Sequence, residues 1–415
     1  MIKKALMCAL MSATAVTSFA GTEVKMLHIE TTREIVSEWE AMAKEFEQSN
    51  PGIDIDLQFA ANEDFKAKLP TLLQSKQRPD IFYSWGGGNF QVRADAGLLN
   101  DITPSKAAFK KGLSGGAVDA FTSQGKLYGV PYMVSAVGFW YNKELFAKAG
   151  IDANAMGTWS GFLAGVKKLK NAGVTPIAVG GADKWPIHFY WSYLVMRAGG
   201  KNAFDAATAD SGTGFAGPAF VTASKELKRL AELEPFQNGY MAAGYGESAG
   251  LFGDKKAAMH LMGDWDYAFA RQQSIDKKGV ADNQLGWMPF PSLEGGKGAA
   301  TDTLGGINGW ALAKGAKPEA VKWLQFFLNK TNQSRLAGKD YIIPVAKGAD
   351  AAIQNPFKKQ IAASVSNAGW HQVFFDQALG ADVGGVVNDI SAELVSGDLE
   401  VDEALERVQE AWEMR

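Results

Sequence analysis

Strand and helix patterns alternate along the N-terminal third of the chain, and this order limits the folds that it can adopt. Residues 24–29 and 53–59 have the pattern of strands, and residues 35–46 between them place apolar side chains at helical spacing. A second helical segment precedes a third apolar run at 80–85. Because helices that join consecutive strands bring those strands together in parallel, we predict an α/β fold with a mostly parallel sheet and helices on both faces.

The rest of the chain continues this alternation and is too long for one core. A second series starts near residue 137, with a helix at 159–171 and a strand at 175–179, and residues 356–415 look helical. Single cores rarely grow beyond about 250–300 residues, whereas this chain has 415 residues. We therefore predict two lobes, each a mostly parallel sheet flanked by helices.

The N-terminus has the pattern of a secretory signal peptide. Lys3 and Lys4 precede an apolar stretch at 5–16 that is too short to span a bilayer, and small residues surround a cleavage position after Ala20. We predict that residues 1–20 are a signal peptide and that the mature protein is exported to the periplasm. No later segment has about 18 uncharged apolar residues in a row, so we expect no direct membrane insertion.

Charge and residue usage argue against several classes of function. Without residues 1–20 the chain has 40 basic and 45 acidic side chains, a net charge of −5, and we expect no nucleic-acid partner. Cys8 lies within the predicted signal, so the mature chain has no cysteine for a disulfide or a thiolate metal site. The four histidines show no metal-ligand spacing. We expect no metal, no cofactor and no catalytic residue.

The third strand ends in residues that suit the wall of a binding site. The apolar run stops at Trp85, which is followed by the glycines 86–88 and by Asn89. Open α/β sheets bind ligands beyond the carboxyl ends of their strands, and glycines let a ligand approach the backbone closely. A buried strand followed by a flexible turn would give the same pattern. Trp85 and Asn89 are nevertheless candidate ligand-binding residues.

Several short segments occur in a fixed order along the chain: 46–53 (FEQSNPGI), 78–81 (RPDI), 128–132 (YGVPY), 140–146 (WYNKELF), 255–259 (KKAAM), 263–265 (GDW) and 305–310 (GGINGW). Together they resemble the carbohydrate-binding branch of bacterial ABC-transporter solute-binding proteins, the broad family of maltose-binding protein. Each motif is weak alone, but the ordered set spans essentially the whole mature chain.

The resemblance implies a two-lobed periplasmic-binding-protein fold in which the chain crosses a three-segment hinge. The crossings are expected near 134–138, 301–305 and 343–344. Lobe 1 would then contain residues 21–136 and 304–343, and lobe 2 would contain 137–303 and 344–415. The implied function is to capture a neutral mono- or oligosaccharide between the lobes, as a monomer, and to deliver it to an inner-membrane ABC permease.

A sugar ring has an apolar face and a rim of hydroxyls, so its site needs flat aromatic surfaces and polar side chains. By the strand-end argument, the loop of Arg33 after the first strand and the loop of Glu63 after the second should face the site. Which carboxylate in 62–64 binds ligand and which caps the helix stays open. Trp185, in a loop between a strand and a helix, is a further aromatic candidate.

The remaining candidate ligand-binding residues are those that the family resemblance implies. Trp265 is the first choice for a stacking platform, with Asp264 beside it, although the tryptophan could pack in the core and the aspartate could cap a helix. Trp370 and His371 are carried over from the C-terminal region of the family. Asp302, at the second hinge crossing, could reach both lobes or simply stabilise a turn. Several aromatic platforms together favour a di- or oligosaccharide.

Two alternatives remain at this level. The same fold could bind a charged solute, which would need convergent carboxylates for a cation or basic groups and helix N-termini for an anion. A secreted carbohydrate-active enzyme would need two carboxylates across the scissile bond. The mixed aromatic and polar candidates favour a neutral sugar, and the resemblance over the whole chain is to a non-catalytic family.

Overall fold

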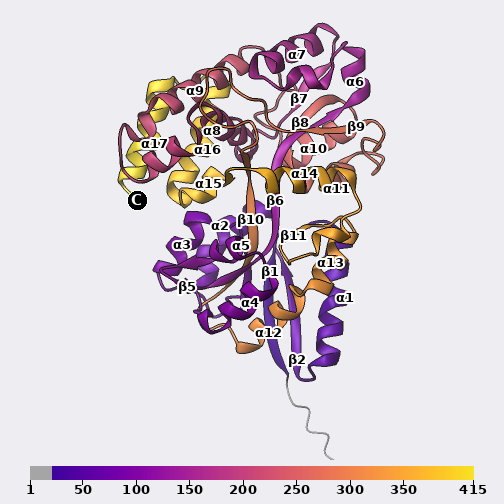
Figure 1. Ribbon diagram of the computed structural model, residues 1–415, viewed down its shortest axis with the longest axis vertical. Coiled ribbons are helices and arrows are strands. Elements are labelled where there is room, and N and C mark those ends of the chain that lie inside the picture. Colours follow the sequence, from indigo (N-terminus) through magenta and orange to yellow (C-terminus); the bar gives the residue numbers. More distant parts are fainter. Residues whose placement is uncertain (1–20) are drawn as a thin grey trace, which may run out of the picture.

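The computed structural model describes residues 21–415, which form two α/β lobes stacked along the longest axis of the molecule (Figure 1). This confirms the predicted two-lobed α/β architecture. The predicted signal peptide, residues 1–20, lies outside the described residues. No helix within residues 21–415 combines the length and the apolar composition that crossing a bilayer requires.

The first lobe, the lower one in Figure 1, contains the N-terminal elements and a later insertion of helices. Its elements are β1 (Thr22–His28), α1 (Arg33–Ser49), β2 (Ile53–Phe59), α2 (Asn62–Leu73), β3 (Ile81–Ser84), α3 (Gly87–Asp95), α4 (Lys106–Gly112), α5 (Gly115–Asp119), β4 (Thr122–Ser123), β5 (Lys126–Leu127), α12 (Pro318–Phe327), α13 (Lys330–Gly338) and β11 (Ile343–Pro344). Strands β2 and β3 both pair with β1 in parallel, as the sequence predicts.

The second lobe, the upper one in Figure 1, is richer in helices. Its elements are α6 (Lys143–Lys148), α7 (Trp159–Asn171), β7 (Thr175–Ala178), α8 (Trp185–Thr208), α9 (Pro218–Ala231), α10 (Tyr245–Gly253), β8 (Ala257–Gly263), α11 (Asp266–Gln273), β9 (Leu285–Met288), α14 (Pro356–Asn367), β12 (His371–Val373), α15 (Phe375–Ala378), α16 (Ala381–Ser396) and α17 (Val401–Glu413). Strands β7 and β8 pair in parallel.

Two long strands join the lobes. They are β6 (Gly129–Asn142) and β10 (Thr303–Leu312), which pair antiparallel with each other. Residues 129–136 of β6 pair with β10, whereas residues 137–142 pair with β8 and β9 of the second lobe. The strand order is therefore β2-β1-β3-β10-β6-β8-β7, with parallel pairs at both ends and antiparallel pairs between them.

The buried apolar residues form two clusters, one in each lobe. Along the chain, membership changes between Met133 and Ala136, between Leu304 and Trp310, and between Ile353 and Phe357. At the expected crossing, 343–344, Ile343 packs in the cluster of the second lobe, whereas Ile342 and Val345 pack in that of the first. The segment after β11 returns to the first lobe, where the backbone of 345–347 hydrogen bonds to residues 112 and 114.

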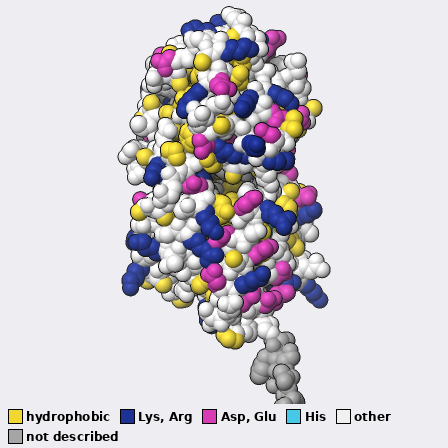
Figure 2. Space-filling view, turned by 90° about the vertical axis from the view of Figure 1, so that its right-hand side faces the viewer, with side chains coloured by type: hydrophobic (Ala, Val, Ile, Leu, Met, Phe, Trp, Pro, Cys, Tyr) yellow, Lys and Arg dark blue, Asp and Glu magenta, His cyan; other side chains and the backbone are white. Residues whose placement is uncertain are grey.

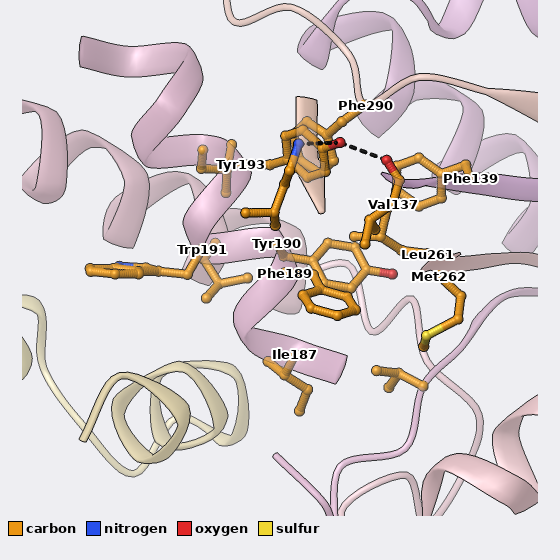
Figure 3. Close-up of a cluster of buried hydrophobic side chains, with 14 of the residues drawn as sticks. Val137, Phe139, Ile187, Phe189, Tyr190, Trp191, Tyr193, Leu261, Met262 and Phe290 are labelled. Atoms are coloured by element: carbon orange, nitrogen blue, oxygen red, sulfur yellow. Dashed lines mark hydrogen bonds between the residues drawn. The ribbon is translucent and has the colours of Figure 1, made fainter. Parts of the chain in front are cut away.

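One buried tyrosine ties two of these crossings together. The hydroxyl of Tyr193, on α8, donates to the carbonyl oxygen of Val137 on β6 at 2.6 Å and accepts from the amide of Leu304 on β10 at 3.1 Å (Figure 3). Its ring stacks on Phe290, with centroids 4.6 Å apart. The point where β6 and β10 enter the second lobe is thus fixed to the core of that lobe.

Candidate ligand-binding site

A cavity of about 360 Å³ lies between the two lobes, a size typical of small-molecule sites. Figure 2 shows the corresponding hollow between the upper and lower halves of the molecule. The first lobe contributes residues that follow its strands: 29–32 after β1, Ala61 and Asn62 after β2, and Trp85 after β3. The second lobe contributes residues at the end of β8 and at the start of α8. The cavity therefore lies beyond the carboxyl ends of the strands, as the sequence predicts.

The indole of Trp265 is seated by a glycine two positions before it. A side chain at Gly263 would collide with the six-membered part of the Trp265 ring, so only glycine leaves room for it. The carbonyl oxygen of Gly263 accepts a hydrogen bond from Trp140 Nε1 at 3.0 Å, which fixes the end of β8. Trp265 also meets Phe374 edge to face. The ring thus lines the cavity on a rigid support.

Asp264 forms a buried ion pair with a residue almost a hundred positions away. Its Oδ2 lies 3.1 Å from Nζ of Lys358 on α14, and both side chains are almost inaccessible to solvent. Asp264 Oδ1 has no hydrogen-bond partner within the described residues. The pair neutralises the local charge and leaves one carboxylate oxygen available in the cavity lining.

Five further buried polar atoms of cavity-lining residues lack a partner within residues 21–415. They are the hydroxyl of Tyr132, Oδ1 of Asn308, Nε2 of His188, Oδ1 of Asn62 and the donor Nε1 of Trp39. An unpaired buried polar group costs about 1–3 kcal/mol, so these atoms favour a polar ligand.

The tautomer of His188 follows from its neighbours. Its Nδ1 lies 2.7 Å from the carbonyl oxygen of Trp185, which can only accept, so Nδ1 carries the proton. Burial lowers the pKa of the imidazole below its usual value, which keeps the ring neutral. Nε2 is then a hydrogen-bond acceptor, as are Asn308 Oδ1 and Asp264 Oδ1. The cavity is rich in acceptors and suits a ligand with several O–H or N–H donors.

Glu30 adds a carboxylate from the loop after β1. Its Oε1 accepts from the backbone amide of Thr32 at 2.7 Å, and burial raises the pKa of its carboxyl group. Thr31 and Thr32 line the cavity beside it. The sequence predicts that this loop faces the site, and it does so through residues 30–32 rather than through Arg33.

Four of the ten residues predicted from the sequence lie together in the cavity wall. They are Trp85, Trp185, Asp264 and Trp265. Trp85 meets Tyr83 and Phe65 edge to face, and Trp185 does the same with Phe189 and Tyr245. Two tryptophans from different lobes are thus held on opposite sides of the lobe boundary.

Arg33 and Glu63 lie outside the cavity lining. Arg33 is the first residue of α1 and is exposed. Glu63 is also exposed, and its Oε1 lies 3.1 Å from Nζ of Lys66, one turn further along α2. At the start of a helix, neighbouring side chains point in different directions. It is Asn62 and Lys66, rather than Glu63, that reach the cavity.

Asn89 and Asp302 also lie outside the lining, and both make structural hydrogen bonds. Asn89 Nδ2 donates to Gln377 Oε1 of the second lobe at 2.9 Å. Asp302 accepts from the amides of Ala299 and Trp370, which is the role of a turn aspartate. It borders a second cavity, of about 720 Å³, which has no aromatic residue in its lining.

Trp370 and His371 pack beside the hinge rather than in the cavity. The Trp370 ring is 8% exposed and lies against Phe204 in the core of the second lobe. His371 Nδ1 is 2.8 Å from Oγ1 of Thr303, and burial lowers the pKa of its ring to about 4. Both residues belong to the segment that pairs with the start of β10, so their side chains are used in packing.

Sequence reasoning did not single out several lining residues that the structure brings together. They are Glu30, Lys66, Tyr132, His188, Asn308 and Lys358. His188 is one turn after Trp185 on α8, and this spacing was a usable signal. Nothing in the sequence pairs Lys358 with Asp264, because their proximity depends on where the fold places α14 relative to the residue that follows β8.

Comparison with known proteins identifies the family. Residues 30–334 match the pattern of the bacterial extracellular solute-binding proteins. The chain belongs to this family.

Relatives and solved structures agree with this assignment. The chain is 27% identical to an ABC transporter extracellular-binding protein of Pyrococcus horikoshii, covering 83% of this chain and 77% of the relative. It is 26% identical to the multiple sugar-binding protein of Streptococcus mutans, covering 78% and 75%. A solved chitin oligosaccharide binding protein superposes with a TM-score of 0.85 at 26% identity, covering 95% of this chain and 98% of that one. The relatives of this solute-binding protein thus include an extracellular-binding protein of an ABC transporter and proteins named for binding sugars.

Proposed function

We propose that this solute-binding protein is the periplasmic receptor of an ABC importer, and that it captures a neutral carbohydrate in the cavity between its lobes. The observation that carries the proposal is the combination in one cavity of the supported Trp265 ring with the unpaired acceptors Asp264 Oδ1, Asn308 Oδ1 and His188 Nε2. Sugar hydroxyls can donate to such acceptors, while the C–H face of the ring packs on an indole. The sugar-binding relatives named above support the same ligand class.

The charge distribution in the cavity favours a neutral ligand over a charged one. Lys358 neutralises Asp264, and Lys66 is paired with Glu63. Among residues 21–415, no three His, Cys, Asp or Glu side chains lie close enough to hold a metal ion.

A binding role also fits the cavity carboxylates better than glycoside hydrolysis does. An enzyme of that type needs one carboxyl group to give up a proton while a second attacks or activates water. Here Asp264, the carboxylate beside the Trp265 ring, is held in an ion pair with Lys358. In the proposed role, the protein acts as a monomer and releases its ligand unchanged to the permease.

Closure of the lobes would couple binding to delivery. The lobes meet through side-chain contacts around the cavity, including Asn89 with Gln377 and Gln272 Nε2 with the carbonyl oxygen of Thr31 at 3.1 Å. A ligand that touches both lobes stabilises this arrangement over one in which they are apart. The permease would then recognise the closed pair of lobes.

A thermal-shift screen tests the proposal. The mature protein, residues 21–415, would be heated with neutral mono- to tetrasaccharides, sugar acids, polyamines and divalent metal ions. A ligand at 100 times its dissociation constant adds about 2.7 kcal/mol of stability, so the cargo class gives a clear shift. A shift with one neutral saccharide series, and no reaction product after long incubation, is the expected result. Shifts with charged solutes alone would contradict it.

A further inference from the structure

Lys66 lies against the tryptophans of both lobes. Its Nζ is 5.7 Å from the centroid of the Trp85 ring and 5.9 Å from that of the Trp185 ring, within the usual reach of a cation–π interaction. Lys66 belongs to α2 of the first lobe, whereas Trp185 begins α8 of the second. The ammonium group therefore bridges the two indoles across the lobe boundary.

Glu63 holds the ammonium group in this place. Its Oε1 lies 3.1 Å from Lys66 Nζ and also accepts from Asn62 Nδ2 at 2.7 Å. The Lys66 side chain is 28% exposed, so the bridge sits at the edge of the cavity, between its interior and solvent. Trp185 is 9% exposed and lines the same cavity.

This arrangement changes what the two tryptophans can do. A sugar ring stacks on an indole through direct contact of its C–H face with the aromatic face. The Lys66 ammonium lies within cation–π reach of both rings, so it competes with a sugar ring for the space beside them. By contrast, Trp265 lines the same cavity without a cation over its ring among the described residues.

We propose that Lys66 limits the length of the carbohydrate, because its ammonium group occupies the space between Trp85 and Trp185 that one further sugar ring would take. The inference rests on the proposed function and refines it. The ligand would fill the part of the cavity around Trp265 and the unpaired acceptors, and would end at the ammonium group. The several tryptophans that favoured a long ligand in the sequence are then not equivalent: two of them flank an end wall.

The test compares chain-length profiles of Lys66 variants. Xylo-, chito- and malto-oligosaccharides of one to six units would be titrated calorimetrically into the mature wild-type protein, Lys66→Ala and Lys66→Met. Lys68→Ala is the matched control, since Lys68 lies on the same helix, is 69% exposed and pairs with Asp64 instead. A melting curve for each variant reports whether it is folded.

We expect wild-type affinity to stop rising at a certain length in the series that binds. In Lys66→Ala the affinity should rise for one more unit, by about tenfold, because the freed indoles accept another ring. Lys66→Met, which keeps the stem but not the charge, should give a smaller gain, and Lys68→Ala should match the wild type.

Two results would overturn the length limit while leaving the receptor intact. The first is an unchanged plateau in Lys66→Ala. The second is an equal loss of affinity at every length, which would mean that Lys66 serves lobe closure or contacts the ligand directly. Failure of the wild-type protein to bind any series would instead overturn the proposed function, and the length limit with it.

Discussion

Asn89 Nδ2 of the first lobe donates to Gln377 Oε1 of the second lobe at 2.9 Å. Beside this bond, the backbone of the first turn of α3 lies directly against the backbone of α15 and the residues after it (Figure 1). A side chain at Gly87 or Gly88 would lie within 3 Å of backbone atoms of 377–380. The lobes thus meet at a seam, formed by residues 87–89 and 377–380, where two glycines permit backbone-to-backbone contact.

The seam predicts the effect of adding one methyl group. In Gly88→Ala, the new Cβ would lie 2.5 Å from the carbonyl oxygen of Ala378 and 2.9 Å from the amide nitrogen of Gly380. Backbone atoms cannot move aside cheaply, so the closed lobes are penalised while each lobe alone is unaffected. We expect saccharide affinity to fall at least tenfold with little change in melting temperature.

The matched control for this variant is Gly385→Ala. Gly385 lies in helix α16, and a Cβ there would meet no atom within 4 Å. Calorimetric titration of both variants with saccharide measures whether the seam takes part in closure. Equal affinities for Gly88→Ala and Gly385→Ala would show that the seam does not take part in closure.

Trp265 is expected to supply a stacking surface. Because the ring rests over Gly263 and its loss removes contact area in the cavity wall, Trp265→Ala should weaken saccharide binding by about 10- to 100-fold. Trp265→Phe, which keeps an aromatic face, should recover part of the affinity. Isothermal titration with the best-bound saccharide measures both. Wild-type affinity in Trp265→Ala would exclude Trp265 from the site.

The Asp264–Lys358 pair predicts an asymmetric effect on stability. Lys358→Met leaves the Asp264 carboxylate buried without its partner, which should lower the free energy of unfolding by about 3 kcal/mol. The double variant Asp264→Asn with Lys358→Met removes both charges and should be more stable than Lys358→Met alone. Urea unfolding of the mature protein measures the difference. A double variant that is less stable than Lys358→Met would contradict this account.

His28 should make the first lobe sensitive to acid. The ring is buried, its Nδ1 accepts from the amide of Glu30, and burial lowers its pKa to about 4. In the unfolded chain a histidine takes up a proton near pH 6.5. The stabilising contribution of the neutral ring is therefore complete above pH 6.5 and is lost as the pH falls toward 4.

For this one residue the loss at pH 4.5 should be about 2.5 kcal/mol. His28→Asn keeps an acceptor near the Glu30 amide but does not titrate in this range. Urea unfolding at pH 7.5 and 4.5 should show a smaller pH-dependent loss in the variant than in the wild type. The same loss in both proteins would mean that His28 is not responsible.

Local patterns made the fold and the place of the site predictable, but not the contacts within the site. The strand at 53–59 and the helix at 159–171 have the predicted bounds, because periodicity determines which face of an element is buried. The glycines after Trp85 were predicted to let a ligand approach, yet two of them accommodate the other lobe. That use depends on a segment almost three hundred residues away.

Contacts between residues far apart in the sequence also explain the other differences between the predicted and the observed site residues. Trp370 follows a short polar run that suits a loop, and only its packing on Phe204 shows that it belongs to the core. Lys358 reaches Asp264 through the tertiary placement of α14. Lys66 reaches Trp185 because α2 and α8 of the two lobes lie close together. A single sequence can identify residue types that suit a sugar, but which of them share a cavity follows from the fold.

The most direct test of the central claim is small-angle scattering of the mature protein with and without the saccharide that gives the largest thermal shift. If the ligand binds between the lobes and stabilises their contact, the radius of gyration should decrease on addition of saccharide. The decrease should be smaller in Gly88→Ala at the same saccharide concentration. A radius of gyration that does not change, at a saccharide concentration that saturates the thermal shift, would contradict binding by closure of the two lobes.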